Sequence, residues 1–165
     1  MAKQRKLTAG EIALARAAFA DKIDYKKVRL NDGPGYQPLA HAAFAKGNPA
    51  ITVGSVVYFK DHYSNDFSAA GQAKGSFIHE MTHVWQYQAM GMPVFFARYG
   101  AEFVHADGKP DDMYKYKEET DSFGEAMLEA QANMVQHYSE ALWTNNAAKK
   151  ARIARNLADS GVYGL

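Results

Sequence analysis

The sequence predicts a mostly helical α+β fold with a small sheet, formed by a single domain over residues 1–165. Two observations support this fold class. Apolar residues recur at helical spacing over several stretches, and only two short segments carry the β-branched and aromatic residues typical of strands. A length of 165 residues is enough for one hydrophobic core and too short for two ordinary domains.

Each expected helix is marked by the spacing of its apolar residues and by signals at its ends. Thr8 and Glu11 have the spacing of a capping box, which places the start of a helix at Thr8. Gly91 and Pro93 follow another periodic stretch and indicate where that helix stops. The helices are expected over residues 8–20, 68–90, 121–142 and 145–158.

Two segments are expected to form strands. Residues 28–30 are brief, while residues 51–59 form a β-branched and aromatic run that predicts one continuous strand. Gly54 inside that run is interpreted as a glycine of an edge strand. The residues between the strands, 31–49, are rich in turn formers and are expected to form a loop.

The remaining segments carry weaker patterns. The basic residues 1–6 are expected to form a solvated end of the chain. Residues 105–112 are polar and rich in turn formers, so they predict an exposed loop. Four aromatic side chains before this loop are expected in the core: Phe95, Phe96, Tyr99 and Phe103.

The composition excludes several kinds of chemistry. The chain has no cysteine, so it has no disulfide, no thiolate nucleophile and no cysteine-ligated zinc or iron–sulfur site. A metal site would therefore use His, Asp and Glu, and this donor set suits a catalytic zinc better than a structural one. The 19 Lys and Arg against 18 Asp and Glu make no net basic surface, so no nucleic-acid partner is expected.

The start of the chain lacks the features of a secretory signal peptide, because no sustained apolar stretch follows its basic residues. No run approaches the ~18 apolar residues that would cross a bilayer, so no membrane span is expected. We expect the protein to be made in the cytoplasm, and any export to use a route without a cleaved signal.

The pattern His-Glu-x-x-His occurs inside the second expected helix. His79 and His83 are four residues apart, so on a helix both imidazoles can reach one ion from the same face. Glu80 is offset by about 100° from His79, near enough to act on a metal-bound water without being a ligand. This arrangement is that of a zinc hydrolase with Glu80 as general base. The alternative is two ordinary surface histidines beside a glutamate.

A catalytic zinc usually has three protein ligands, so a third must come from elsewhere in the chain. The long metzincin pattern is absent, since Gln86 and Ala89 stand where it requires glycine and histidine. Glu129 is favoured because its small neighbours would let its helix approach the metal-binding helix. The alternatives are Glu125, His105 and Asp121, and a second role for Glu125 is to orient a histidine.

A hydrolase also needs a donor for the oxyanion of its transition state. Tyr114 and Tyr116 precede the segment that carries Glu129 and are the candidates for this role. The other histidines lack a partner pattern. His41 and His137 are expected to be structural, and His62 is expected in a loop.

The stretch His79–Gln86, with Glu129–Ala132 about fifty residues later, resembles the zincin-type metallopeptidases associated with bacterial type VI secretion spike proteins, including Vgr-related proteins. Residues 7–11 and 51–59 are also similar, so the resemblance spans most of the chain. It implies a zincin-like fold in which His79, His83 and Glu129 bind Zn²⁺ and Glu80 is the general base, as in gluzincins. It also implies that residues 51–59 form an edge strand that holds an extended peptide.

The resemblance implies a zinc-dependent metallopeptidase that hydrolyses peptide bonds in a peptide or protein substrate. It further implies a toxin effector, carried by a secretion spike protein and delivered by a type VI system to the periplasm of a target cell. An immunity partner is not identified. Two alternatives remain: a zinc amidase that acts on peptidoglycan, and a non-catalytic adaptor of the secretion apparatus that keeps the zincin fold.

Overall fold

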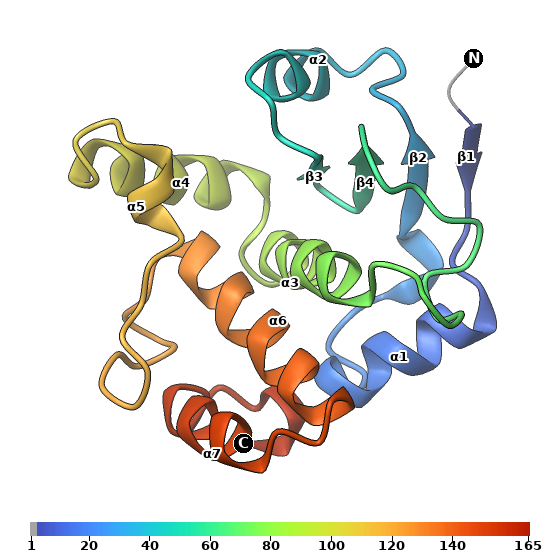
Figure 1. Cartoon of the computed structure of the whole chain (residues 1–165). Coiled ribbons are helices and arrows are strands. Elements are labelled where there is room, and N and C mark those ends of the chain that lie inside the picture. The colour runs from blue at the N-terminus through green and yellow to red at the C-terminus, as the bar shows by residue number, and fades with distance from the viewer. Residues whose placement is uncertain (1–2) are drawn as a thin grey trace.

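The computed structural model describes residues 3–165 and shows a mostly helical α+β fold with a small four-stranded sheet (Figure 1), as the sequence predicts. The strands are β1 (Lys3–Arg5), β2 (Arg29–Asp32), β3 (Ala50–Val53) and β4 (Val56–Phe59). The helices are α1 (Ala9–Phe19), α2 (Pro38–Ala45), α3 (Lys74–Met90), α4 (Met92–His105), α5 (Pro110–Met113), α6 (Leu128–Trp143) and α7 (Ala147–Asn156). Short 3₁₀ turns form at Tyr25–Lys27 and Val162–Gly164.

Helix α3 is central in the fold (Figure 1), with the sheet and α1 on one side and α6 on the other. Its apolar side chains Ile78, Met81 and Val84 are fully buried in the main core. Helix α7 packs against α6 and contributes Ile153 to the same core. Among residues 3–165, no helix is both long and apolar enough to cross a bilayer.

The sheet has the strand order β1-β2-β4-β3, so β3 lies at one edge. The expectation of one strand over residues 51–59 is wrong, because the segment is a hairpin in which Val53 faces Val56 across a two-residue turn. Gly54 has a φ of 63° at the first turn position, where a tight hairpin favours glycine. β-branched residues lie directly on both sides of the short Gly54–Ser55 turn, and this hides the break between the strands in the sequence.

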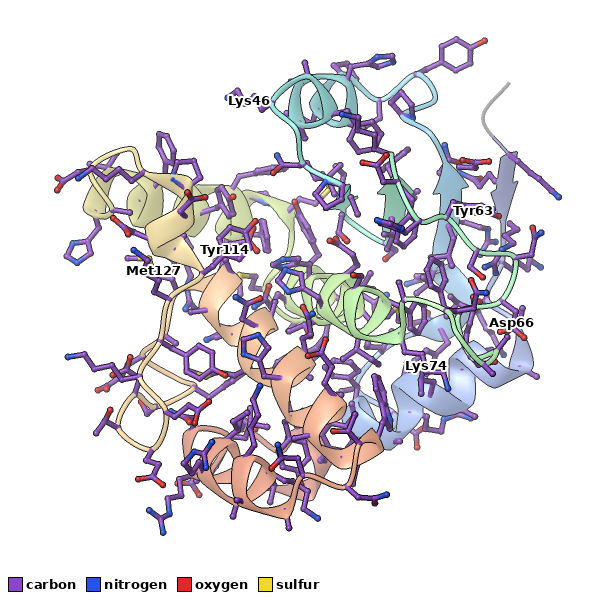
Figure 2. All side chains as sticks on the ribbon, in the orientation of Figure 1. Lys46, Tyr63, Asp66, Lys74, Tyr114 and Met127 are labelled. Carbon is purple, nitrogen blue, oxygen red and sulfur yellow. The ribbon has the colours of Figure 1, made fainter. Side chains whose placement is uncertain are left out.

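The first described residues differ from the solvated end that the sequence predicts for residues 1–6. Residues 1–2 lie outside the described part of the chain, but Lys3–Arg5 forms β1, which pairs with β2. Arg5 makes two hydrogen bonds to the fully buried carboxylate of Glu11, at 2.7 and 2.8 Å, and another to the Tyr63 hydroxyl beside β1 (Figure 2). The start of the chain is therefore held by a buried ion pair.

Substitution of Glu11 by alanine is expected to lower the free energy of unfolding by about 3–5 kcal/mol, the usual cost of removing one partner of a buried ion pair. Glu11 also accepts the backbone N–H groups of Thr8 and Phe67, which would lose their partner. The matched control is Asp21→Ala, because Asp21 pairs with Arg16 in solvent. Urea unfolding of both variants measures the difference. Equal stability of the two would contradict this role.

Several helix boundaries differ from the expected ones. The capping box of Thr8 and Glu11 is confirmed at the start of α1. Helix α3 begins at Lys74, later than residue 68, and α6 begins at Leu128 because residues 121–127 form turns.

Short helices replace parts of the expected loops. Helix α2 lies within residues 31–49, where Pro38 occupies its first turn and the Gln37 side chain caps it. Helix α5 begins within residues 105–112, at Pro110, and ends at Met113. Pro93, which the sequence places after the end of a helix, lies in the first turn of the next helix, α4. Of the four aromatic residues expected in the core, Phe95 is buried, whereas Phe96 and Phe103 are 41% and 39% exposed.

Candidate metal centre

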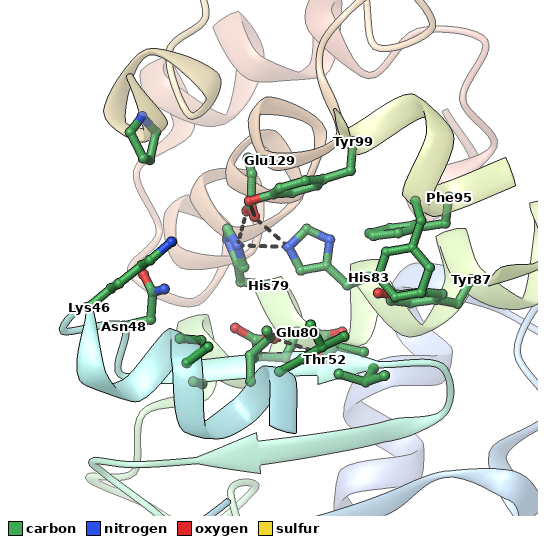
Figure 3. A pocket seen from close by; sticks show the side chains of 18 of the residues that line it. Lys46, Asn48, Thr52, His79, Glu80, His83, Tyr87, Phe95, Tyr99 and Glu129 are labelled. Atoms are coloured by element: carbon green, nitrogen blue, oxygen red, sulfur yellow. Dashed lines mark hydrogen bonds and ion pairs between the residues drawn. The ribbon is translucent and has the colours of Figure 1, made fainter. Parts of the chain in front are cut away.

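Three buried side chains converge at the centre of the molecule (Figure 3). His79 and His83 lie one turn apart on α3, with their Nε2 atoms 3.2 Å apart. The Oε2 atom of Glu129 lies 3.2 Å from the Nε2 of His79 and 3.0 Å from the Nε2 of His83. All three ligand atoms lie within 4.8 Å of one another, so this group could hold a metal ion.

Packing between α3 and α6 brings Glu129 to the two histidines. Glu129 is in the first turn of α6, and its neighbours Ala130 and Ala132 are buried. Because alanine leaves little bulk between two helices, the backbone of α6 can approach α3 closely. The carboxylate therefore reaches the imidazoles from a position far away in the sequence.

A chain of amide groups orients His83. Its Nδ1 atom lies 2.7 Å from the Oε1 atom of Gln86, whose amide nitrogen donates to the Leu128 carbonyl and to Gln131. Since the Oε1 atom of Gln86 only accepts, Nδ1 must carry a proton, and Nε2 is the nitrogen that can bind a metal once the metal displaces its proton. The glutamine that breaks the metzincin pattern thus positions a histidine of this group.

A tyrosine that sequence reasoning assigned to the core also contacts the group. The hydroxyl of Tyr99 on α4 donates to Oε1 of Glu129 at 3.3 Å, leaving Oε2 to the histidines. Tyr114 stacks its ring on His79 at 6.0 Å between centroids. Tyr116, the other oxyanion candidate, instead pairs its hydroxyl with Nδ1 of His137 at 2.7 Å. Tyr99 lies on a separate helix, so no spacing pattern in the sequence links it to the histidines or to Glu129.

The alternative third ligands lie elsewhere. Glu125 accepts a hydrogen bond from Ser122 at the surface, and Asp121 accepts the backbone N–H of Lys117. His105 is exposed at the end of α4. The structure therefore joins Glu129, and none of these three alternatives, to the two histidines. His41, which is not among the alternatives, contacts the carbonyl of Gly35.

Glu80 is buried beside the group and points toward the sheet. Its Oε2 atom accepts a hydrogen bond of 2.7 Å from the hydroxyl of Thr52 on β3 (Figure 3). Thr52 also donates to the backbone carbonyl of Glu80 at 3.3 Å. The edge strand thus holds the carboxylate in place, a contact that sequence reasoning missed because the two residues belong to different elements.

Opposite charges within the group dominate its electrostatics. Burial alone would raise the pKa of Glu129, but the adjacent His83 and His79 hold the pKa of this carboxyl well below its usual range. Burial lowers the pKa of His83, yet the carboxylates of Glu129 and Glu80 outweigh it and raise that pKa to about 9. Burial, reinforced by the charge of Glu129, raises the pKa of Tyr99 and of Tyr114, so both phenols stay protonated donors.

The group opens into a cavity of about 370 Å³. Helix α2 and strand β3 form one wall, and α4 with the end of α3 forms the other. His79, Glu80, His83 and Glu129 all line this space, and its volume is within the range of small-ligand sites. A molecule in the cavity can therefore contact the three ligand atoms and the Glu80 carboxylate at once.

Comparison with known proteins finds similarity over much of the chain. Residues 11–91 match the model of the family described as the eCIS core domain, a range that includes His79 and His83 and ends before Glu129. The chain is also 40% identical over 87 residues to the type VI secretion system spike protein VgrG2b of Pseudomonas aeruginosa. That match covers 51% of this chain and only 8% of the spike protein.

The structural similarity extends further along the chain. The solved effector domain of Pseudomonas aeruginosa VgrG2b matches it with a TM-score of 0.66 and 29% identity, over 93% of this chain and 82% of that domain. The chain is therefore homologous to this effector domain over nearly its whole length. The chain that shows this homology contains both α3 and α6, the helices that carry the candidate metal group.

Proposed function

We propose that the protein is a zinc-dependent peptidase. The observation that carries this proposal is the buried group of His79, His83 and Glu129, which opens into a cavity beside the carboxylate of Glu80. A purely structural site would not need a carboxylate held ready at the cavity wall, and Thr52 holds Glu80 there.

The three ligand side chains suit zinc in a catalytic setting. Two imidazole nitrogens and one carboxylate oxygen are a common donor set of catalytic zinc, and three protein ligands leave a position for water or substrate. When bound, zinc supplies a Lewis acid that polarises a carbonyl group and lowers the pKa of water. The hydrogen bonds of Gln86 and Tyr99 orient His83 and Glu129 toward the ion.

Glu80 is the general base of the proposed reaction. Its carboxylate takes a proton from the attacking water, whose oxygen forms the new bond to the carbonyl carbon of the peptide. The same proton then goes to the amide nitrogen as the carbon–nitrogen bond breaks. The products are a carboxylic acid and an amine. Tyr114, whose protonated phenol lines the cavity beside His79, is the proposed donor to the oxyanion.

Strand β3 supplies a surface for an extended substrate. It is an edge strand, and all four of its residues line the cavity. The backbone groups on its unpaired side can hydrogen-bond a peptide as an added strand. Thr52 lies on this strand, so the bound peptide would run directly past Glu80.

The homology to an effector domain supports a cellular role in type VI secretion. We propose that the protein acts as an effector associated with a secretion spike, and that it hydrolyses its substrate in the periplasm of a target cell. A domain that works there gains from having no cysteine, because no unwanted disulfide can form.

The test is metal content and hydrolysis of an unstructured protein substrate, measured together. The wild-type protein is expected to bind one zinc ion per chain and to cleave the substrate. Removal of the metal with a chelator should abolish cleavage, and added zinc should restore it. His79→Ala is expected to lose both metal and cleavage, while His41→Ala, at an exposed histidine of α2, keeps both.

A protein that binds zinc and cleaves no peptide bond under any of these conditions would contradict the peptidase and favour the non-catalytic adaptor. Cleavage that survives complete removal of the metal would contradict the proposed chemistry.

A further inference from the structure

The cavity at the metal group is chemically different at its two ends. At one end, aromatic rings from α3 and α4 face small and apolar side chains of α2 (Figure 3). These rings are Tyr87, Phe95, Phe96, Tyr99 and Phe103. Tyr87 and Phe95 stack at 3.7 Å between centroids and are buried, so they form a firm base for this end of the cavity.

The rim of this aromatic end is exposed to solvent. Phe96 and Phe103 on α4 are 41% and 39% exposed, and Leu39 on α2 is 44% exposed on the opposite wall. Exposed apolar side chains that gather around a cavity indicate a ligand that covers them. An apolar side chain of the ligand, bound between these walls, would shield the three exposed side chains from water.

The other end of the site is polar. A second cavity of about 340 Å³ shares His79, Glu80 and Tyr114 with the first, so the two cavities adjoin at the candidate metal group and are together called the cleft. Most side chains that line only this second cavity are polar: Asp61, His62, Ser76, Asp111, Asn133 and Gln136, beside the apolar Pro49, Phe59 and Phe67.

Strand β3 runs along the cleft from its polar end to its aromatic end. Ala50 lines both cavities, whereas Val53 lines only the aromatic one. A peptide paired with β3 would therefore pass the Glu80 carboxylate. The peptide residues on either side of that point would lie in two different environments. Each residue of an extended strand advances about 3.3 Å, so a few residues span both ends.

We propose that the cleft selects a peptide with a large apolar side chain on one side of the cleaved bond and a small polar residue on the other. This inference rests on the proposed peptidase function and names its substrate class. The aromatic end gains its binding energy from burial of the apolar side chain. A peptide built only from small and charged residues, as in peptidoglycan cross-links, would leave that end unfilled.

The test measures peptide binding to the zinc-loaded Glu80→Gln protein by fluorescence polarisation. The probes are two fluorescein-labelled hexapeptides of glycine with phenylalanine and serine at the centre, one in each order. Matched peptides carry alanine or glutamate in place of phenylalanine. The better phenylalanine peptide is expected to bind at least about tenfold more tightly than its matched peptides, since burial of such a side chain contributes about 1.5–3 kcal/mol.

Variants of the cavity rim identify where the side chain binds. Phe96→Gln and Phe103→Gln, each in the Glu80→Gln protein, are expected to weaken binding of the phenylalanine peptide about fivefold, because each removes part of the buried apolar surface. Binding of the alanine peptide should not change. The control is Val104→Gln, since Val104 is 74% exposed on α4 and is not part of the cavity lining.

Equal or tighter binding of the alanine or glutamate peptide would overturn the proposed selectivity. An equal effect of Val104→Gln would overturn its assignment to the cavity. Selective binding without cleavage by the wild-type protein would reject the peptidase and keep the subsite, whereas cleavage without this selectivity would reject the subsite and keep the peptidase.

Discussion

Substitution of Glu80 by glutamine is expected to lower the rate of peptide hydrolysis by about 10²–10⁴-fold, the usual contribution of a general base. Glutamine has nearly the same shape and can still accept the hydrogen bond from Thr52. It cannot take a proton from water at neutral pH. Zinc affinity is expected to stay within about twofold of wild type, because Glu80 is not one of the three ligand residues.

The measurement pairs steady-state hydrolysis with a zinc titration of the same preparations. Glu118→Gln is the matched control, since Glu118 pairs with Arg152 on the surface, away from the cavity. Its activity should equal that of wild type. Unchanged hydrolysis in Glu80→Gln would reject the proposed role of this carboxylate.

Removal of the Glu129 carboxylate is expected to have the largest effect on metal binding. In Glu129→Ala, zinc affinity should fall by on the order of 10³-fold. The binding free energy of a zinc ion held entirely by protein ligands is about 10–16 kcal/mol. Because few ligands share this free energy, the loss of one ligand has a large effect. The two histidines would remain, but they alone cannot complete the set of three ligands. Without zinc, hydrolysis should fall in parallel.

Glu125→Ala is the matched control for this variant, since it removes a carboxylate four residues earlier that bonds only to Ser122 among the described residues. Competition with a chromophoric chelator measures both affinities, and the melting temperature of the metal-free proteins shows whether each variant folds. A larger loss of zinc affinity in Glu125→Ala than in Glu129→Ala would reverse the assignment of the third ligand.

The two halves of the candidate metal group lie differently with respect to the family match. The family match over residues 11–91 includes both histidines and Glu80, whereas Glu129 follows nearly forty residues later. The structural comparison covers 93% of the chain, well beyond the length of that family match. The group is therefore assembled from a segment with a strong motif and a segment with a weak one.

Features that depend on neighbours within one helix could be predicted from the sequence alone. The four-residue spacing of His79 and His83 brings both imidazoles to one face wherever that helix is formed. The pairing of Thr8 with Glu11 is likewise local, since the capping box closes within one turn. The mostly helical fold class followed from apolar periodicity in the same way.

Features that depend on contacts between elements could be seen only once the chain is folded. The packing of α6 on α3 brings Glu129, rather than Glu125, to the histidines. The contacts of Tyr99 with Glu129 and of Thr52 with Glu80 join residues of different elements, so no local pattern records them. The sequence restricts which side chains can bind a metal, and the packing of two helices and a strand determines which of them meet.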